Sequence, residues 1–264
     1  MKFLQKILYV WRLIAKVIAY ASFGICSTIF TLTFPFIFIF SGFSKKRFRM
    51  LARAVNFRFF QLFVLEMKLL GILTVHVEHK ERFQNFRPCV IVANHPSFLD
   101  VVILFSIIPN ANCIVKGSLA KTPFVNTVVS ALFIPNTLPF EEQLERARIG
   151  MSEGESLIIF PEGTRTKSGE PLHFKKGAAR FAIHSGRCAL PIYIGGNEKI
   201  GIRKNDAFFR FHPSERYHYN LDLLLPIFPG KFEEHSKPAA VELLTKEMQN
   251  VLELCRNRDP EKET

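Results

Sequence analysis

The feature that most constrains this chain is an uncharged stretch near its amino terminus. Residues 18–40 contain no Asp, Glu, Lys or Arg and are rich in Phe and Ile. Because a helix needs about 20 predominantly apolar residues to cross a bilayer core, the stretch is long enough to span a membrane. Basic residues lie on both sides of it, so the distribution of positive charge indicates no orientation.

Three other interpretations of this stretch stay open. A break at Pro35 would make it a helical hairpin or an anchor lying in the membrane plane. A cleaved signal peptide is disfavoured, because the stretch is long for such a segment and no A-x-A cleavage site follows it. A core helix buried in protein would have a similar composition.

The next segment, residues 47–70, interleaves basic and aromatic side chains. Arginines stand at positions 47, 49, 53 and 58, and phenylalanines at positions 48, 57, 59, 60 and 63. This pattern is typical of a helix that lies on lipid headgroups with its basic residues facing phosphates. Nucleic-acid binding uses the same residue types, but the neighbouring apolar stretch favours lipid.

Composition narrows the class of protein further. The formal net charge is +12 and hydrophobic residues make up 48% of the chain. This combination excludes a disordered chain and fits anionic lipid surfaces or acidic substrates better than DNA. The five cysteines are scattered without a C-x-x-C pair, which argues against a zinc site or a disulfide framework and indicates a reducing compartment. They are Cys26, Cys89, Cys113, Cys188 and Cys255.

From residue 73 onward, short apolar runs alternate with helical stretches. The pattern predicts strands at residues 73–77, 89–93, 113–115, 157–160, 191–194 and 217–225. It predicts helices at residues 99–108, 140–152, 175–185 and 239–254. Such alternation is typical of an α/β domain. We therefore expect a membrane anchor with an interfacial helix in residues 1–70 and one α/β domain in residues 71–264.

His95 follows the predicted strand at residues 89–93, at the end of a strand where α/β folds place ligands. Pro96 denies His95 a regular helical backbone, so Asp100 can approach it across a strand–turn–helix junction. A carboxylate bonded to one imidazole nitrogen leaves the other nitrogen available as a general base for a hydroxyl. A His–Asp pair that only caps a helix would explain the spacing equally well.

A polar loop follows the predicted strand at residues 157–160. Gly163 lets a ligand approach the backbone, Thr164 offers a hydroxyl, and Arg165 offers a planar fork that matches phosphate oxygens. Glu162 could anchor Arg165 or bond a ligand hydroxyl. The alternative is a polar turn closed by a Glu–Arg pair.

Lysines stand at two further element boundaries. Lys116 follows the predicted strand at residues 113–115, and Lys175 and Lys176 open the helix at residues 175–185. Helix starts favour anions, so these lysines predict attraction of phosphate. A solvated charged surface is the alternative for each of them.

Together these segments resemble the 1-acyl-glycerol-3-phosphate acyltransferases and the wider lysophospholipid acyltransferases. The family's first block, N-H-x-x-x-x-D, is matched by Asn94, His95 and Asp100. Its third block, F-P-E-G-T-R-S, is matched at residues 160–165, with Thr166 in place of Ser. The resemblance covers roughly residues 73–200, and the combination of blocks is specific although each alone is not.

Other blocks of the family are present in the same order. F-K-K-G-A-A stands at residues 174–179, an apolar segment around a proline at residues 190–194, and a basic residue at Lys116. The second block, G-x-x-F-I-x-R, departs: Ser130 replaces the Gly and Asn136 replaces the Arg. In the family that Arg is associated with the acceptor phosphate, so the resemblance leaves open an acceptor other than lysophosphatidic acid, such as an ornithine-type aminolipid.

The resemblance implies an α/β domain with a mixed sheet flanked by helices, preceded by a membrane-anchoring helical segment. It implies an O-acyltransferase of phospholipid biosynthesis that moves a fatty acyl chain from acyl-CoA or acyl carrier protein to the hydroxyl of a lyso-lipid. His95 would be the base and Asp100 would orient it. The acceptor and its phosphate would be held by Glu162, Gly163, Thr164, Arg165, Lys116 and Lys175.

The expected partners are membrane lipids and the acyl donor, with no nucleic acid, no metal and no bound cofactor. Because such donors are cytosolic, we expect the site on the cytoplasmic side of the cell inner membrane. A hydrolase using the same pair is a rival, but the sequence has no G-x-S-x-G nucleophile elbow. A non-catalytic lipid-binding protein on the same fold is the other rival.

Overall fold

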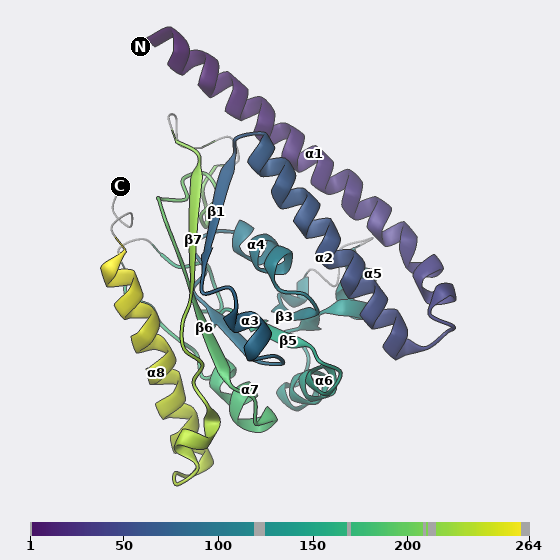
Figure 1. Ribbon diagram of the computed structural model, residues 1–264, viewed down its shortest axis with the longest axis vertical. Coiled ribbons are helices and arrows are strands. Elements are labelled where there is room, and N and C mark those ends of the chain that lie inside the picture. The colour runs from purple at the N-terminus through teal and green to yellow at the C-terminus, as the bar shows by residue number, and fades with distance from the viewer. Residues whose placement is uncertain (1, 119–124, 168–169, 208–209, 211–214, 260–264) are drawn as a thin grey trace.

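The computed structural model describes residues 2–118, 125–167, 170–207, 210 and 215–259. A long helical pair packs beside a seven-stranded mixed sheet that carries helices on both faces (Figure 1). The helices are α1 (Lys2–Phe40), α2 (Lys45–Leu69), α3 (Arg82–Asn85), α4 (Leu99–Ile107), α5 (Val125–Leu132), α6 (Phe140–Ser152), α7 (Gly177–Ser185) and α8 (Lys237–Arg258). The strands are β1 (Leu73–Glu78), β2 (Val90–Ala93), β3 (Ala111–Val115), β4 (Ile134–Pro135), β5 (Ser156–Ile159), β6 (Ala189–Gly195) and β7 (Tyr217–Leu223). The α/β fold class expected from the sequence is confirmed.

The order of the strands decides where functional loops can gather. The sheet runs β1-β7-β6-β2-β5-β3-β4, and every neighbouring pair is parallel except β6 and β7. The five strands from β6 to β4 therefore end at one edge of the sheet, where open α/β sheets bind ligands. β1 and β7 run the other way and end at the opposite edge.

Strand β2 lies inside the sheet and is buried on both faces. Its four residues are completely inaccessible to solvent. Ile91 and Ala93 face the apolar cluster formed with α2 and α4, whereas Val90 and Val92 face the cluster formed with α7 and α8. Successive side chains of a strand point to opposite faces of the sheet. A strand that is covered by helices on both faces therefore consists of apolar residues throughout, as in the sequence V-I-V-A.

Helix α1 is continuous through Pro35 to Phe40, so the alternative of a break at Pro35 is wrong. Its 39 residues correspond to a length of about 58 Å. In the part of the chain that the structure describes, it provides the one helix long and apolar enough to cross a membrane. Only 11% of its most apolar stretch is buried, which argues against the core-helix interpretation.

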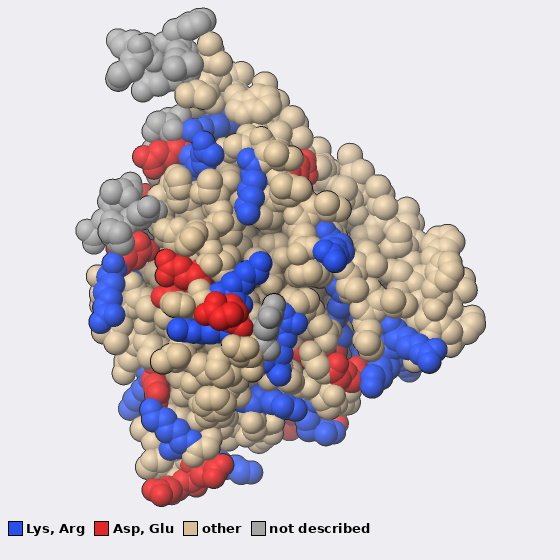
Figure 2. All heavy atoms as spheres, in the orientation of Figure 1, with Lys and Arg blue, Asp and Glu red and all other residues tan. Residues whose placement is uncertain are grey.

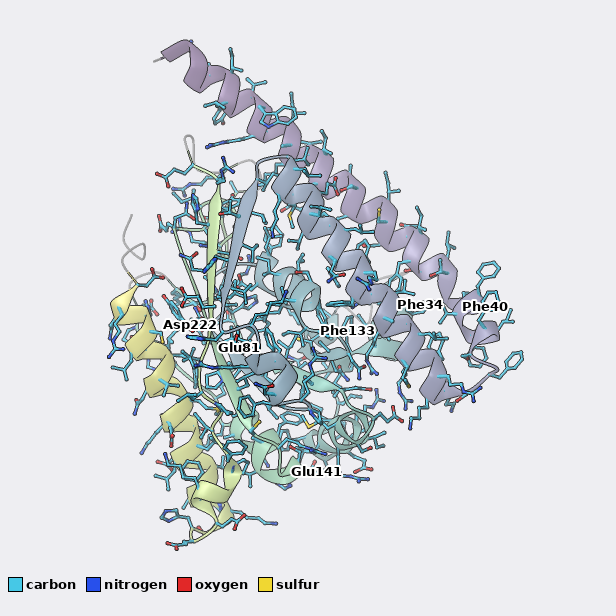
Figure 3. All side chains as sticks on the ribbon, viewed as in Figure 1. Phe34, Phe40, Glu81, Phe133, Glu141 and Asp222 are labelled. Atoms are coloured by element: carbon cyan, nitrogen blue, oxygen red, sulfur yellow. The ribbon has the colours of Figure 1, made fainter. Side chains whose placement is uncertain are left out.

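The outer face of the helical pair is apolar. Ile25, Ile29, Leu32 and Phe36 are exposed on α1 at intervals of three or four residues and so form one stripe. Figure 2 shows this side of the molecule as a broad surface with few charges, and Figure 3 shows Phe40 pointing away from the protein at the tip. Such a surface needs an apolar partner to cover it.

The turn between the two helices follows from local sequence. Gly42 takes a left-handed conformation with φ of 63°, which glycine adopts without a steric penalty. Ser44 then caps α2, its hydroxyl oxygen accepting a hydrogen bond from the backbone N–H of Arg47. The chain therefore reverses within four residues, and α2 packs antiparallel along α1 (Figure 1).

Two arginines of α2 do not face lipid phosphates as the sequence suggested. Arg53 is buried and its guanidinium pairs with the carboxylate of Glu155, while Arg49 donates to both carboxylate oxygens of Glu153 at 2.7 Å. Both acidic residues lie where α6 leads into β5. The two arginines therefore fasten α2 to the sheet domain, and Arg47 and Arg58 are the exposed pair.

Several short elements were not expected from the sequence. They are α3, α5, β4 and a 3-10 turn at Pro229–Phe232. The two-residue β4 has no periodicity of its own to detect, since pairing with β3 defines it. Helix α5 contains several β-branched residues, which by themselves favour strands. Packing against the rest of the protein overrides that preference.

The buried pair between α2 and β5 generates a stability prediction. Glu155 is buried with Arg53, and the Nδ2 amide of Asn112 donates to its Oε2 at 3.1 Å. Replacing Glu155 by Ala leaves the Arg53 charge buried without its partner, which should cost about 3 kcal/mol of the free energy of unfolding. Thermal unfolding in detergent micelles measures this loss.

The control is Glu145→Ala. Glu145 pairs with Arg148 at 2.6 Å, but both side chains are exposed to solvent. Exposed pairs contribute little to stability, so this variant should unfold close to the wild-type temperature. Equal effects of the two substitutions would show that burial of the Arg53–Glu155 pair has no special importance.

Candidate functional site

The site is centred on the segment that joins β2 to α4. The imidazole Nδ1 of His95 lies 2.7 Å from Oδ2 of Asp100. Asp100 is fully buried in the first turn of α4, whereas the His95 side chain retains 18% of its accessible surface. The strand–turn–helix junction thus brings the two residues together, with the carboxylate inside and the imidazole at the surface of the site.

Asp100 accepts further hydrogen bonds from its own turn. The Ser97 backbone N–H donates to Oδ2 at 2.8 Å, and the Ser97 hydroxyl donates to Oδ1 at 2.6 Å. The Tyr219 hydroxyl lies 2.7 Å from the Ser97 hydroxyl. A buried carboxylate is stable only when its oxygens are hydrogen-bonded, so these donors stabilise Asp100 in its buried position.

The His95 ring is held on its other side by an aromatic ring. Phe160 stacks on the imidazole with a centroid distance of 4.1 Å and an interplanar angle of 23°. With Nδ1 donating its proton to Asp100, Nε2 is left with a lone pair. In the described part of the chain no hydrogen bond occupies Nε2. The ring can therefore accept a proton from a group that enters the site.

The loop after β5 is tied directly to His95. The His95 backbone N–H donates to Thr166 Oγ1 at 2.9 Å and to Glu162 Oε1 at 3.3 Å. Thr166 returns a backbone hydrogen bond to the His95 carbonyl at 2.7 Å and donates its hydroxyl to Glu162 at 2.5 Å. Burial raises the pKa of Glu162 above its usual value. Thr166 therefore couples the two loops, a role that the sequence did not reveal.

Gly163 and Lys175 lie against each other. Gly163 has φ of 67°, and a Cβ at this position would lie 2.9 Å from the Lys175 ammonium. Glycine thus permits both the left-handed turn and the close approach of the lysine. Thr164 accepts a hydrogen bond from Lys204 at 3.0 Å. Two ammonium groups therefore lie against this loop, that of Lys175 at Gly163 and that of Lys204 at Thr164.

Arg165 makes hydrogen bonds inside the protein that the sequence did not suggest. Its Nη1 donates to the backbone carbonyls of Arg203 at 2.9 Å and Ile202 at 3.3 Å. The described residues show no ion pair between Arg165 and Glu162, so the turn is not closed by the Glu–Arg pair considered above. Arg165 instead braces the segment after β6 against the loop after β5.

The remaining predicted cations occupy different settings. Lys116 is exposed and follows β3 at the edge where β2 and β5 also end. Lys176 pairs with Glu242 of α8 at 3.5 Å, which makes it part of the outer surface. The structure therefore places Lys116 and Lys175 at the same edge as His95 and directs Lys176 elsewhere.

Asn136, which departs from the family's second block, has a structural partner. Its Oδ1 accepts a hydrogen bond from the Gly117 backbone N–H at 2.9 Å, and its own N–H donates to the Val115 carbonyl. Asn136 thereby joins the ends of β3 and β4. Ser130, the other departure, lies in α5, and its side chain is outside the described ones.

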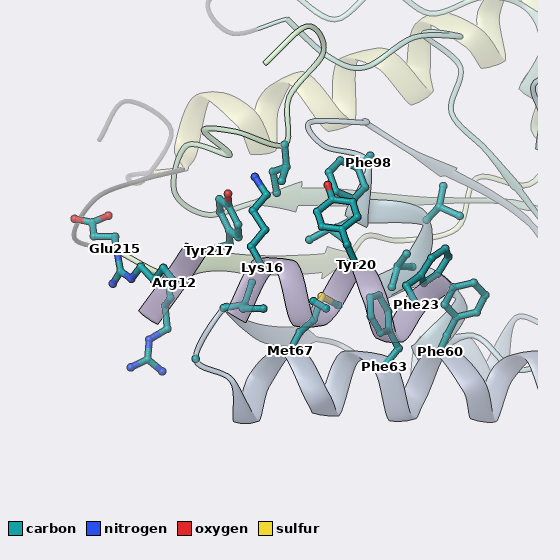
Figure 4. A pocket seen from close by; sticks show the side chains of 18 residues that line it. Arg12, Lys16, Tyr20, Phe23, Phe60, Phe63, Met67, Phe98, Glu215 and Tyr217 are labelled. Atoms are coloured by element: carbon teal, nitrogen blue, oxygen red, sulfur yellow. The ribbon is translucent and has the colours of Figure 1, made fainter. Parts of the chain in front are cut away.

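An apolar cavity adjoins the site. It has a volume of about 370 Å³ and lies between α1, α2 and the start of α4 (Figure 4). Phe98 and Leu99 line it and belong to the same junction as Ser97 and Asp100. Its other walls carry Ala19, Tyr20, Phe23, Phe60, Phe63 and Met67 from the helical pair. Sequence reasoning could not find this cavity, because its walls come from segments far apart in the chain.

One end of the cavity is polar. Figure 4 shows Arg12 and Glu215 together at this end, and Lys16 between Tyr217 and Tyr20. The Lys16 ammonium donates to the carbonyls of Gly201 at 3.2 Å and Arg210 at 3.0 Å. The charged end of α1 is thus bonded to the sheet domain while the next two turns of the helix form an apolar wall.

One group of side chains could bind a cation. Glu78, His79 and Asp222 have ligand atoms within 4.8 Å of one another. β1 and β7 end at the edge of the sheet opposite to the one that carries His95, and these residues stand there. The group therefore takes no part in the chemistry at His95.

Comparison with known proteins agrees with the geometry. Residues 74–195 match the family model described as Acyltransferase. In sequence, this segment is similar to acyltransferase-family domains. It holds the His95–Asp100 pair, the Glu162–Thr166 loop and Lys175, and along the chain it includes the strands from β1 to β6 but not β7.

Curated relatives resemble the acyltransferase domain over part of their length. The chain is 33% identical over 121 residues to the chloroplastic 1-acyl-sn-glycerol-3-phosphate acyltransferase BAT2 of Brassica napus, covering 43% of this chain and 34% of that one. It is 30% identical over 139 residues to the human 1-acyl-sn-glycerol-3-phosphate acyltransferase beta, covering 49% of each. The chain thus matches half or less of the length of these relatives.

A solved structure extends the likeness of fold to the helical pair. The crystal structure of the 1-acyl-sn-glycerophosphate acyltransferase PlsC from Thermotoga maritima superimposes with a TM-score of 0.62 at 24% identity. The match covers 96% of this chain and 99% of that one. The arrangement of the helical pair and the sheet domain is therefore a known fold.

The setting of Arg165 generates a prediction that needs no activity assay. Arg165→Ala removes the donors that hold the carbonyls of Ile202 and Arg203, so the segment 199–206 should open more often. Hydrogen–deuterium exchange should then be about tenfold faster in that segment. Arg180→Ala on α7 is the control and should leave the segment at its wild-type rate. Unchanged exchange in Arg165→Ala would mean that Arg165 does not brace the segment 199–206.

Proposed function

We propose that this chain is a membrane-bound O-acyltransferase that moves a fatty acyl chain from acyl-CoA or acyl carrier protein to the hydroxyl of a lyso-lipid such as 1-acyl-glycerol-3-phosphate. The observation that carries the proposal is the His95–Asp100 pair, with its free Nε2 beside a cationic loop and an apolar cavity. The names of the curated relatives support the reaction and the acceptor.

In the proposed reaction His95 acts as the general base. Its Nε2 takes the proton of the acceptor hydroxyl while that oxygen attacks the thioester carbonyl carbon. Asp100 stabilises the imidazolium that forms and holds the ring in place. The carbon–sulfur bond then breaks, and His95 returns the proton to the departing thiolate. The products are an acylated lipid and the free thiol of the donor, with no acyl-enzyme between them.

The acceptor's phosphate would bind at the loop after β5. Lys175 stands against Gly163, Lys204 bonds Thr164, and Lys116 lies at the same edge of the sheet. Ammonium groups attract a phosphate without demanding one geometry. Glu162 shapes this loop through Thr166, and Arg165 contributes the part of its guanidinium that the carbonyls of residues 202 and 203 leave unused.

The apolar cavity is proposed to bind a fatty acyl chain. Nearly all of its wall is hydrocarbon or aromatic, and it starts at Phe98 and Leu99, next to the base. Binding a chain there removes apolar surface from water, at about 25 cal/mol per Å². No nucleic acid, metal or bound cofactor is part of the proposed reaction.

The proposed location is the cytoplasmic side of the cell inner membrane, where thioester donors are available. The exposed apolar stripe of α1 and the aromatic tip at Phe40 and Phe43 support insertion of the helical pair into a bilayer. The exposed Arg47 and Arg58 on α2 suit contact with lipid phosphates.

Asn136 favours a second candidate acceptor. It brings no charge to the end of β4, and its Oδ1 is already bonded to Gly117. A lyso-lipid without a phosphomonoester, such as an ornithine-type aminolipid, is therefore the alternative acceptor. The intact His95–Asp100 pair argues against a non-catalytic lipid-binding protein on this fold.

The central experiment measures acyl transfer by purified protein from labelled acyl-CoA and acyl carrier protein to a panel of lyso-lipids. His95→Ala should lower kcat by about a thousandfold or more, because it removes the proton acceptor. His76→Ala, which changes an exposed histidine of β1, should keep the wild-type rate. Transfer by His95→Ala near the wild-type rate would overturn the assignment of the base.

The panel also decides the acceptor. Transfer to lysophosphatidic acid would support the first acceptor and make Asn136 a tolerated change. Transfer only to an aminolipid would support the second acceptor. No transfer with any donor and acceptor pair would contradict the proposed function.

The cavity generates a prediction on chain length. Ala19 lines the cavity on α1, so Ala19→Trp should fill part of it and raise the ratio of kcat/KM for short over long acyl donors about tenfold. Ala21→Trp places the same side chain on the exposed side of α1 and should keep the wild-type preference. An unchanged preference in Ala19→Trp would show that acyl chains bind elsewhere.

A further inference from the structure

We infer that Tyr219 is a positioning residue for the His95–Asp100 pair and acts on it through the hydroxyl of Ser97. The inference rests on the proposed role of His95. Tyr219 lies on β7, 122 residues beyond Ser97 in the chain and outside the segment that matches the acyltransferase family model.

The hydrogen-bond chain has one direction. The Ser97 hydroxyl has a single proton, which it donates to Oδ1 of Asp100 at 2.6 Å. The contact of 2.7 Å between the Ser97 and Tyr219 hydroxyls therefore uses the proton of Tyr219. The Tyr219 hydroxyl thus donates to the Ser97 hydroxyl, which in turn donates to the Asp100 carboxylate. Because each donor polarises the next, Tyr219 strengthens the bond that Ser97 gives to the carboxylate.

Burial makes the hydrogen bonds from Tyr219 through Ser97 to Asp100 hard to replace. Tyr219, Ser97 and Asp100 are all fully inaccessible to solvent, so no water can replace a missing donor without a rearrangement. Burial raises the pKa of Tyr219 well above its usual value, with the nearby Asp100 charge contributing in the same direction. The phenol is therefore protonated across the working pH range and remains a donor.

The sheet order explains why a residue of β7 reaches this turn. β7 pairs antiparallel with β6, and β6 pairs parallel with β2. The beginning of β7 is consequently at the same edge as the end of β2, where Ser97 stands. Tyr219 also packs under the Lys199 ammonium, which lies 4.6 Å from the ring centroid and donates to the His218 carbonyl at 2.7 Å.

Other charged and titratable groups face the pair and must be kept constant in any test. Glu162 accepts from the His95 backbone, and Arg256 contributes a more distant positive charge on that side. Lys199 and Tyr217 lie on the side of Tyr219. None of them donates to the Asp100 carboxylate within the described part of the chain, so removal of the Tyr219 hydroxyl changes one link only.

The expected effect has a definite sign. Without Tyr219 as donor, Ser97 gives a weaker hydrogen bond and the Asp100 carboxylate retains more of its negative charge. That charge favours the imidazolium form of His95, so the pKa of His95 should rise. Less of the base is then free at a given pH, and the acid limb of the kcat profile should move to higher pH.

The decisive variant is Tyr219→Phe, which deletes one oxygen atom. We expect kcat on the acid limb of the profile to fall about threefold with KM little changed. The acid limb of the profile should move upward by about half a pH unit. Tyr193→Phe is the matched control, because Tyr193 is a buried tyrosine of the neighbouring strand β6 whose hydroxyl donates to Asp259 instead. This control should keep the wild-type profile.

A double-mutant cycle with Ser97→Ala tests the route. If Tyr219 acts through Ser97, Tyr219→Phe should have no further effect on kcat in the Ser97→Ala background. Additive effects, or a profile in Tyr219→Phe that superimposes on the wild-type one, would overturn the inference.

A second measurement separates this inference from the proposed function. The pKa of His95 is measured by NMR on protein labelled at histidine nitrogens in detergent micelles, which needs no substrate. A rise in Tyr219→Phe but not in Tyr193→Phe supports the inference even if no acyl transfer is found. An unchanged pKa of His95 overturns it even if the wild-type protein transfers acyl chains.

Discussion

The burial of one charge organises the site. The Asp100 carboxylate lies out of contact with water, and a charge in that position must be fully hydrogen-bonded. Its bonds come from His95, from the backbone and hydroxyl of Ser97, and through Ser97 from Tyr219. Each of these groups is therefore held in one place by the same requirement. An imidazole that is fixed in this way presents its second nitrogen in a constant direction, which is the condition for efficient proton transfer.

The sheet brings the loops that form the site together from distant parts of the chain. Five strands end at one edge, so the β2 turn, the loop after β5 and the segment after β6 meet there although they are far apart in sequence. Thr166 and Arg165 connect these loops by hydrogen bonds to backbone atoms, at His95 and at residues 202 and 203. Backbone contacts of this kind fix the shape of the site, and Lys116 and Lys175, which we propose to hold the acceptor's phosphate, stay exposed beside it.

Local patterns predicted the elements and the chemistry more fully than they predicted the contacts. The runs around β2, β5 and β6 and the helix at residues 140–152 could be located because periodicity and burial are properties of neighbouring residues. The proximity of His95 and Asp100 follows from the turn between them. Tyr219, the cavity and the buried partner of Arg53 could not be predicted, because each depends on pairing between segments more than 100 residues apart or on packing of several helices. The sequence predicted that the arginines of α2 contact lipid, but two of them, Arg49 and Arg53, instead pair with Glu153 and Glu155.

The helix that would enter the bilayer is also a wall of the cavity. Ala19, Tyr20 and Phe23 of α1 close it, and Lys16 is bonded to carbonyls of the sheet domain. The amino-terminal segment is therefore not an interchangeable tether. A chimera that replaced α1 with another helix of equal length and hydrophobicity would lose the side chains of Ala19, Tyr20 and Phe23, and the cavity would open to water. In the proposed membrane-bound enzyme, α1 meets two environments at once, lipid on one side and an acyl chain on the other, so substitutions in α1 would be constrained together with those in the cavity walls of α2 and α4.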